Sequence, residues 1–328
     1  MKKNTLILIA KRILSSLIVL FLMLTFIFFL LRISPGDPSL KFVSPQLSPE
    51  LALKVRESFG LNSSILVQYK SFLLNLVQGD LGISYTYRIP VTSVLEEYVP
   101  FTIVFAISSF TIQITFAFLL ALFSVKRINQ FSDKLLSKLS LFAFSIPSFV
   151  LGVFLIFVFS ELLNLFPSSG LTSFDHESFS FINKFFDYLK HITLPLITLS
   201  LAGVAVFYKY LRESLEETFN KPLVLNLRSL GMSEKKIIRK HVIPNAIGPL
   251  ISVAGVELGL LFSGALITEV IFGLPGMGSL TVNSILSRDY PMVIGCTFVA
   301  GFLIILSNLA ADLVRAKLDK RVFKEILN

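Results

Sequence analysis

Long apolar runs alternate with shorter polar segments along the chain. A helix crosses the hydrocarbon core of a bilayer with about 20 apolar residues, so runs near that length indicate transmembrane helices. Six such runs occur, at residues 13–31, about 99–125, about 139–165, about 192–207, about 242–272 and about 292–314. We therefore predict an all-α membrane protein with six transmembrane helices.

The first run resembles the apolar part of a signal peptide, which would be cleaved. However, residues 13–31 contain 19 uncharged residues, more than a signal peptide usually has, and no small-residue cleavage site follows them. We expect this run to be retained as a membrane span.

Two runs contain residues that are uncommon in membrane helices. The third holds Pro147 and Glu161, and the fifth holds several prolines and glycines together with Glu257 and Glu269. An acid inside a membrane is costly and faces protein or water rather than lipid. Glu257 and Glu269 are therefore candidates for lining a solute pathway, and a buried interhelical hydrogen bond is the alternative role for Glu257.

The segment between the first two runs is long enough to fold by itself. Ser48-Pro49-Glu50 is typical of a helix start, with Gly60 as the stop, and a second helical pattern extends from Ile65 to Val77 before Gly79. We expect these helices to cap the outer face. The chain then divides into residues 1–98, the first span and this helical loop, and residues 99–328, a five-span core.

The segment between the fourth and fifth runs, residues 208–241, carries its own helix signals. Pro222 stands near the start of a short helix that Gly231 ends, and Ser233 is placed to cap a second helix rich in lysine and arginine. The spacing of Leu223, Leu227 and Leu230 places these side chains on one face of the short helix.

So short a helix is unstable alone in water, so its apolar face needs a partner. Two interpretations follow from this pattern. The helix lies on the bilayer or on its own protein, or it docks onto a cytoplasmic protein.

Composition agrees with a membrane protein. Aliphatic, aromatic and sulfur-containing residues (Ala, Val, Ile, Leu, Met, Phe, Trp, Tyr and Cys) make up 54% of the 328 residues, only 16% are charged, and the mean hydropathy is +0.77. About a quarter of a soluble protein is charged. The net charge of +9 follows membrane topology rather than nucleic-acid binding, because 21 of the 30 basic residues fall in segments on one side and 9 on the other. Basic residues concentrate on the inner side, so we expect both termini to be cytoplasmic.

Several chemistries are excluded by the residues. The chain has no Gly-x-x-x-x-Gly-Lys-Ser/Thr loop to hold ATP. Its single cysteine, Cys296, and three scattered histidines make a metal site improbable, and no span core contains a histidine to serve an intramembrane serine protease. We expect no catalytic residue, no metal and no cofactor in this chain.

A series of short motifs runs in order from the first apolar run to Arg321. They are Pro35-Gly36-Asp37-Pro38, Gln68-Tyr69, Phe72, Gly79-Asp80-Leu81-Gly82, Ser145-Ile146-Pro147-Ser148-Phe149, His191, Leu194-Pro195, Arg212, Ser214, Arg228, Gly231, Arg239, His241, Asn245-Ala246, Glu269, Pro275-Gly276, Gly278 and Arg288-Asp289-Tyr290-Pro291. By their order and spacing, the chain resembles the permease subunits of ATP-binding-cassette importers of the oligopeptide, dipeptide and nickel type.

This resemblance implies a type I ABC importer permease fold in the cell (inner) membrane. It implies pairing with a second homologous permease, two cytoplasmic ATPase subunits that bind the ATP, and an extracytoplasmic solute-binding protein, with membrane lipid around the spans and no nucleic acid. Peptides are the expected cargo, followed by nickel. It also implies that the short helix fits a groove of the ATPase, and the expected coupling residues are Leu223, Leu227, Arg228, Leu230, Gly231, Ser233 and Glu234.

The chain departs from the family at two places. Leucines precede Gly231 where relatives usually carry alanines and a basic residue, and Glu257 stands where relatives often have an uncharged polar residue. The alternative function is an ion-coupled secondary carrier in which Glu257 and Glu269 take protons.

Overall fold

The computed structural model of the chain describes residues 2–34 and 63–318. The helix expected between Ser48 and Gly60 lies outside these residues. The second helix expected in the outer segment is confirmed, since it spans Ile65–Val77 and is followed by Gly79 in the left-handed conformation, with φ of 77°.

The described residues form helices and connecting turns, and their only β-type pairing is an isolated bridge between Ile83 and Pro90. In chain order the helices are α1 (Lys2–Ile33), α3 (Ile65–Val77), α4 (Val91–Val125), α5 (Phe131–Ser145), α6 (Ser148–Leu155), the π-helical η2 (Ile156–Leu162), the 3-10 turn η3 (His176–Ser178), α7 (Phe181–Phe219), α8 (Pro222–Ser229), α9 (Glu234–Ile237), the π-helical η4 (Ile238–Val242), α10 (Ile243–Phe262), α11 (Leu266–Ile271), α12 (Met277–Ser287) and α13 (Tyr290–Leu318).

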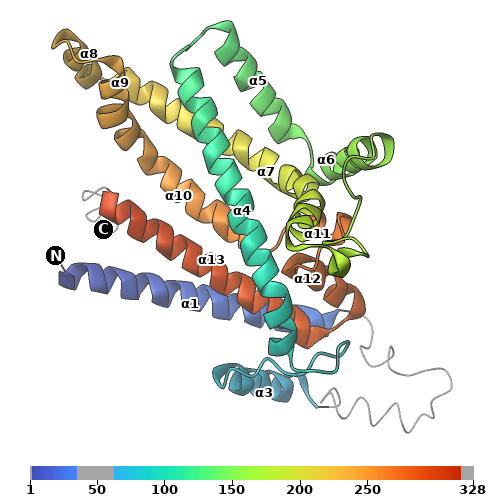
Figure 1. Cartoon of the computed structure of the whole chain (residues 1–328). Helices are drawn as coiled ribbons and strands as arrows, with labels where there is room; N and C mark the ends of the chain where they lie inside the picture. Colours follow the sequence, from blue (N-terminus) through green and yellow to red (C-terminus); the bar gives the residue numbers. More distant parts are fainter. Residues whose placement is uncertain (1, 35–62, 319–328) are drawn as a thin grey trace.

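The predicted fold class is confirmed. Five stretches of the described chain are long and apolar enough to cross a membrane, and a bent helix pair makes up to six. The helices α4, α7, α10 and α13 pack on one another at the centre, and α1 packs along α13 at the periphery (Figure 1).

The third predicted span is not one continuous helix. It consists of α5 and α6 with η2, whose axes differ by 96°. The bend lies at Ile146, whose backbone is extended with ψ of 121°, and at Pro147. A residue before proline avoids helical geometry, and proline itself lacks an N–H for the helix, so this break follows from the local sequence.

The fifth run is interrupted near its C-terminal end. The helix α10 ends before Ser263, Gly264 adopts a φ of 99°, and α11 follows. A Cβ at Gly264 would lie 2.8 Å from the Cα of Gly278, so the glycine permits close approach to the next helix. That helix, α12, occupies the segment between the fifth and sixth apolar runs.

The fourth run is the middle of a much longer helix. The 39 residues of α7 extend for about 58 Å, almost twice the roughly 30 Å of a hydrocarbon core. Residues 208–219, expected to belong to a cytoplasmic loop, therefore continue the membrane helix without a break.

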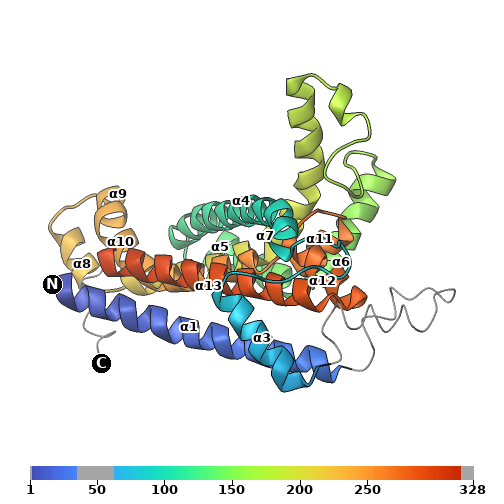
Figure 2. The ribbon, with the colours of Figure 1, turned by 90° about the horizontal axis from the view of Figure 1, so that it is seen from below.

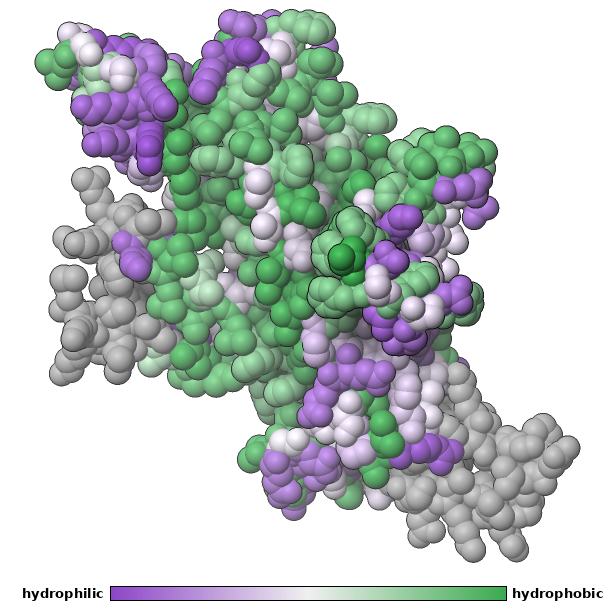
Figure 3. Space-filling view, in the orientation of Figure 1, coloured by the Kyte–Doolittle hydropathy of each residue, from purple (hydrophilic) through white to green (hydrophobic). Residues whose placement is uncertain are grey.

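The segments assigned to each side gather at opposite ends of the molecule. The start of α1, the end of α13 and the pair α8 and α9 lie toward one end, and α3 and α12 lie toward the other (Figures 1 and 2). A broad apolar surface separates hydrophilic groups at these ends (Figure 3).

Candidate functional site

The short helix expected in residues 208–241 is present as α8. It begins at Pro222, which has no N–H to leave unpaired, and its C-terminal turn closes at Gly231, where φ is 76°. A Cβ at Gly231 would meet nothing within 4 Å, so this glycine serves the backbone conformation rather than close packing.

The three leucines predicted to share a face are divided by the packing. Leu223 and Leu230 are exposed, at 53% and 79%, whereas Leu227 packs against the apolar core beside the buried Val224. The helix therefore presents Leu223 and Leu230 to the outside and uses Leu227 to hold itself to the chain. The sequence could not show this division, because both faces carry apolar residues.

Arg228 fixes the turn between α8 and α9. Its Nε donates to Oε1 of Glu234 at 2.6 Å, its Nη2 donates to Oε2 at 3.3 Å, and its guanidinium lies 4.8 Å from the centre of the Phe219 ring. Ser233 occupies the N-cap position of α9 as expected, but its side chain makes no capping hydrogen bond. The ion pair, rather than the serine cap, connects the two helices.

The segment also forms one packed unit with the membrane helices. A single apolar cluster joins Leu215 of α7, Val224 of α8, Ile237 of α9 and Ala246 of α10, all fully buried. Ser214 of α7 donates to the carbonyl of Ala246 at 2.8 Å. Because close-packed interiors transmit displacement, a force on α8 reaches α7 and α10 directly.

Glu257 lies on α10 away from the helix that its neighbouring glycines contact. Gly255 and Gly259 approach Ala311 and Ile304 of α13, and a residue two positions from either points to the opposite side of a helix. Glu257 is half-buried and makes no hydrogen bond or ion pair with the described residues. It is thus an acid available to another molecule or subunit.

Glu269, the second candidate, is fully buried between α11 and α12. Its Oε2 accepts the N–H of Ser279 at 2.9 Å, and Cβ atoms at Gly276 and Gly278 would lie 2.5 Å from Oε1 and 2.8 Å from Oε2. The two glycines therefore make room for the carboxylate at the start of α12, where a negative charge is favoured. This placement gives Glu269 a role in holding α12.

A second buried acid, Asp289, organises the end of the molecule where α12 lies. The carboxylate of Asp289 accepts the N–H groups of Tyr85 at 3.0 Å, Thr86 at 2.9 Å and Met292 at 3.3 Å, and the hydroxyl of Ser84. It joins the loop before α4 to the start of α13. Burial raises the pKa of Tyr85 to about 12, so this phenol stays neutral at physiological pH.

Comparison with known families gives matches along the chain. Residues 113–324 match the family described as binding-protein-dependent transport system inner membrane component, and residues 5–106 match the N-terminal part of such membrane components. Two solved chains of the MetNI methionine ABC transporter in inward-facing conformations are similar at TM-scores of 0.48 and 0.49, with 18% and 16% identity, covering 70% and 69% of this chain and 96% of each of those.

Curated relatives match over nearly the full length. The nickel import system permease protein NikB of Staphylococcus aureus strain USA300 is 31% identical over 313 residues, which cover 94% of this chain and 90% of that protein. The NikB protein of strain bovine RF122 / ET3-1 is 32% identical over the same shares. The chain belongs to the family of binding-protein-dependent transport system inner membrane components and is an ABC importer permease subunit.

Proposed function

We propose that this permease forms a solute pathway together with a second, homologous permease and is driven by two cytoplasmic ATPase subunits. A solute-binding protein delivers the cargo on the outer side. The observation that carries this proposal is α8, a short helix at one end of the molecule that exposes Leu223 and Leu230 while being packed rigidly against α7 and α10. Such exposed apolar side chains on a rigid support suit a protein groove.

Family membership favours this function over the ion-coupled carrier. Glu269 is also buried beneath α12 and accepts a backbone N–H, so it is poorly placed to exchange protons during transport. Glu257 remains the candidate for contact with cargo or with the second permease, since it has no partner among the described residues.

We propose short peptides as the cargo. A half-buried carboxylate such as Glu257 suits the free amine of a peptide. Nickel is a second candidate, because the curated relatives carry the name nickel import permease; a carboxylate also binds divalent cations.

The test is reconstitution of the chain with its proposed partners, a second permease, the ATPase subunits and a solute-binding protein. We expect the ATPase to copurify and uptake to require ATP, to stop with vanadate and to resist a protonophore. Uptake abolished by the protonophore in the presence of ATP, with no ATPase bound, would contradict the proposal. Parallel assays with a radiolabelled tripeptide and with nickel ions, each competed by the other, decide between the cargoes.

A further inference from the structure

The helix α5 is attached to the rest of the molecule in an unusual way. Of its fifteen residues, all of them described, Asp133 alone is fully buried, at 1% exposure. Helices usually bury an apolar stripe, whereas the single fully buried side chain here is an acid. The groups that surround this carboxylate are therefore part of what attaches α5.

Asp133 is held by groups from three places in the chain. Arg212 of α7 donates from Nε to Oδ1 and from Nη2 to Oδ2, both at 2.7 Å, the N–H of Asn129 donates to Oδ2 at 3.0 Å, and the hydroxyl of Ser124 donates to Oδ1. A two-pronged guanidinium–carboxylate contact fixes geometry as well as distance. The Asp133–Arg212 ion pair thus ties the end of α4, the following turn and α5 to α7.

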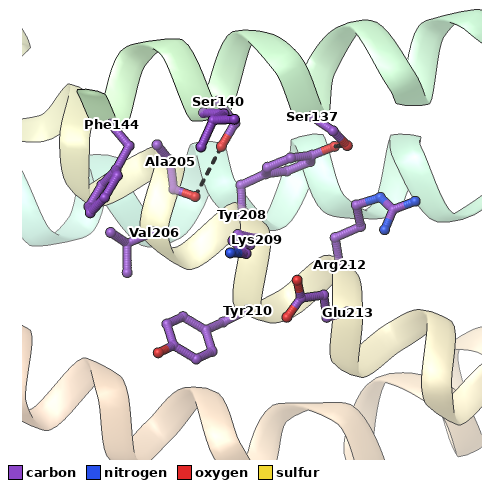
Figure 4. A pocket seen from close by; sticks show the side chains of 11 residues that line it. Ser137, Ser140, Phe144, Ala205, Val206, Tyr208, Lys209, Tyr210, Arg212 and Glu213 are labelled. Carbon is purple, nitrogen blue, oxygen red and sulfur yellow. Dashed lines mark hydrogen bonds between the residues drawn. The ribbon is translucent and has the colours of Figure 1, made fainter. Parts of the chain in front are cut away.

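Packing between α5 and α7 is otherwise incomplete. A cavity of about 590 Å³ lies along the two helices, lined by residues of both including Ser137, Phe144, Val206 and Lys209 (Figure 4). Polar contacts also cross this joint, such as Ser140 donating to the carbonyl of Ala205 at 3.1 Å, and Leu136 of α5 packs against the apolar cluster that includes α7. The Asp133–Arg212 contact is the ion pair between the two helices, and it lies beside this cavity.

The partner of Asp133 lies on the helix that leads into α8. Arg212 stands near the end of α7, where Leu211 and Leu215 belong to the same buried cluster as Val224 of α8 and Ile237 of α9. A displacement of α8 is thereby carried to Arg212, and the ion pair passes it to α5.

We propose that Asp133 and Arg212 are positioning residues for energy coupling, which make α5 move together with α7, α8 and α9 when the ATPases act. This inference rests on the proposed function for the role of the ATPases. The bent helix pair α5 and α6 then follows the coupling helix as part of the same body.

The test measures the distance between α5 and α9 by double electron–electron resonance. Spin labels replace the exposed Lys138 and Lys236 in a Cys296→Ala background. When the Asp133–Arg212 ion pair is intact, the two labels in the purified chain should give one narrow distance distribution. Asp133→Asn and Arg212→Gln should each broaden this distribution, and the double variant should broaden it no further than either single variant. Glu217→Gln, which removes a carboxylate from an exposed ion pair on the same helix, should keep it narrow.

A narrow distribution in Asp133→Asn, or additive broadening in the double variant, would overturn the inference. A second measurement uses the chain without a substitution at position 133, so it does not depend on whether such a variant folds. In the assembled complex, the same distance should stay unchanged between the nucleotide-free and the ATP–vanadate states, and a shift there would also overturn the inference. Failure of the ATPase to bind would contradict the proposed function. The distance measurement in the purified chain would then still decide whether the Asp133–Arg212 ion pair holds α5.

Discussion

Gln113 and Gly203 determine how closely the spans α4 and α7 approach. The amide of Gln113 is fully buried and donates to Ser109 Oγ at 3.2 Å and to the carbonyl of Leu199 at 3.3 Å. A Cβ at position 203 would lie 2.6 Å from its Nε2. The side chain of Gln113 thus fits against α7 because position 203 is a glycine.

We expect Gly203→Ala to destabilise the chain by about 1–3 kcal/mol, the usual cost of overpacking a core. Gly248→Ala is the matched control, because a Cβ there meets nothing within 4 Å and alanine favours helices by about 0.5–1 kcal/mol. Reaction of the single buried thiol, Cys296, with a fluorogenic maleimide during heating reports unfolding of each variant. An unchanged midpoint for Gly203→Ala would show that the two helices separate without cost.

The two acids of the fifth apolar run should respond differently to substitution. Glu269→Ala leaves the buried N–H of Ser279 without its acceptor, so we expect a loss of about 1–3 kcal/mol in the same thermal assay. Glu257→Gln should leave thermal stability and subunit assembly unchanged. If Glu257 lines the pathway, uptake falls and falls most for cationic or free-amine cargo. Equal destabilisation by both substitutions would contradict these assignments.

At the scale of the element, α8 is formed by local signals and directed by its packing. Pro222 and Gly231 define its ends, while Val224 and Leu227 turn toward the core and leave Leu223 and Leu230 exposed. The ion pair of Arg228 with Glu234 fixes the following turn. The apolar surface that α8 leaves free for the proposed docking is therefore narrower than the sequence pattern indicates.

We expect Leu223→Asp and Leu230→Asp to abolish copurification of the ATPase while the permease still folds. Burial of one leucine is worth about 1.5–3 kcal/mol, roughly a ten- to hundred-fold change in affinity. Leu227→Ala should instead lower the thermal midpoint of the permease itself, because this side chain packs on the core. Retention of the ATPase by both aspartate variants would exclude docking through this face.

At the scale of the whole molecule, the arrangement makes a prediction about membrane sidedness. Ser64 precedes α3 and Ser229 ends α8, and both serines are exposed. The helices α3 and α8 lie toward opposite ends of the molecule (Figure 1). From the distribution of basic residues, we expect the α8 end to lie in the cytoplasm.

In a Cys296→Ala background, we expect a cysteine at position 64 to react with an impermeant maleimide from outside intact cells. A cysteine at position 229 should react only after the membrane is opened. The parent without cysteine gives the blank. Labelling of position 64 only from the cytoplasmic side would reverse the topology and remove the basis for an importer.

The sequence alone determined the membrane class, the positions of the apolar runs along the chain, α3, and the start and end of α8. These depend on apolar run length and on proline and glycine conformations, which act over a few neighbouring residues. The division of the chain into residues 1–98 and 99–328 stays a prediction. The α5–α6 bend was locally encoded too, since Pro147 is visible in the sequence, although we expected a continuous span.

The tertiary structure decided which groups meet. Asp133 and Arg212 are 79 positions apart, and nothing local indicates that the charge of one is buried against the other. The burial of Glu269 likewise required α12 to fold over it, and the division of the α8 leucines required a core on one side of that helix. Contacts of this kind join residues distant in the chain, so their partners are determined by how the helices pack.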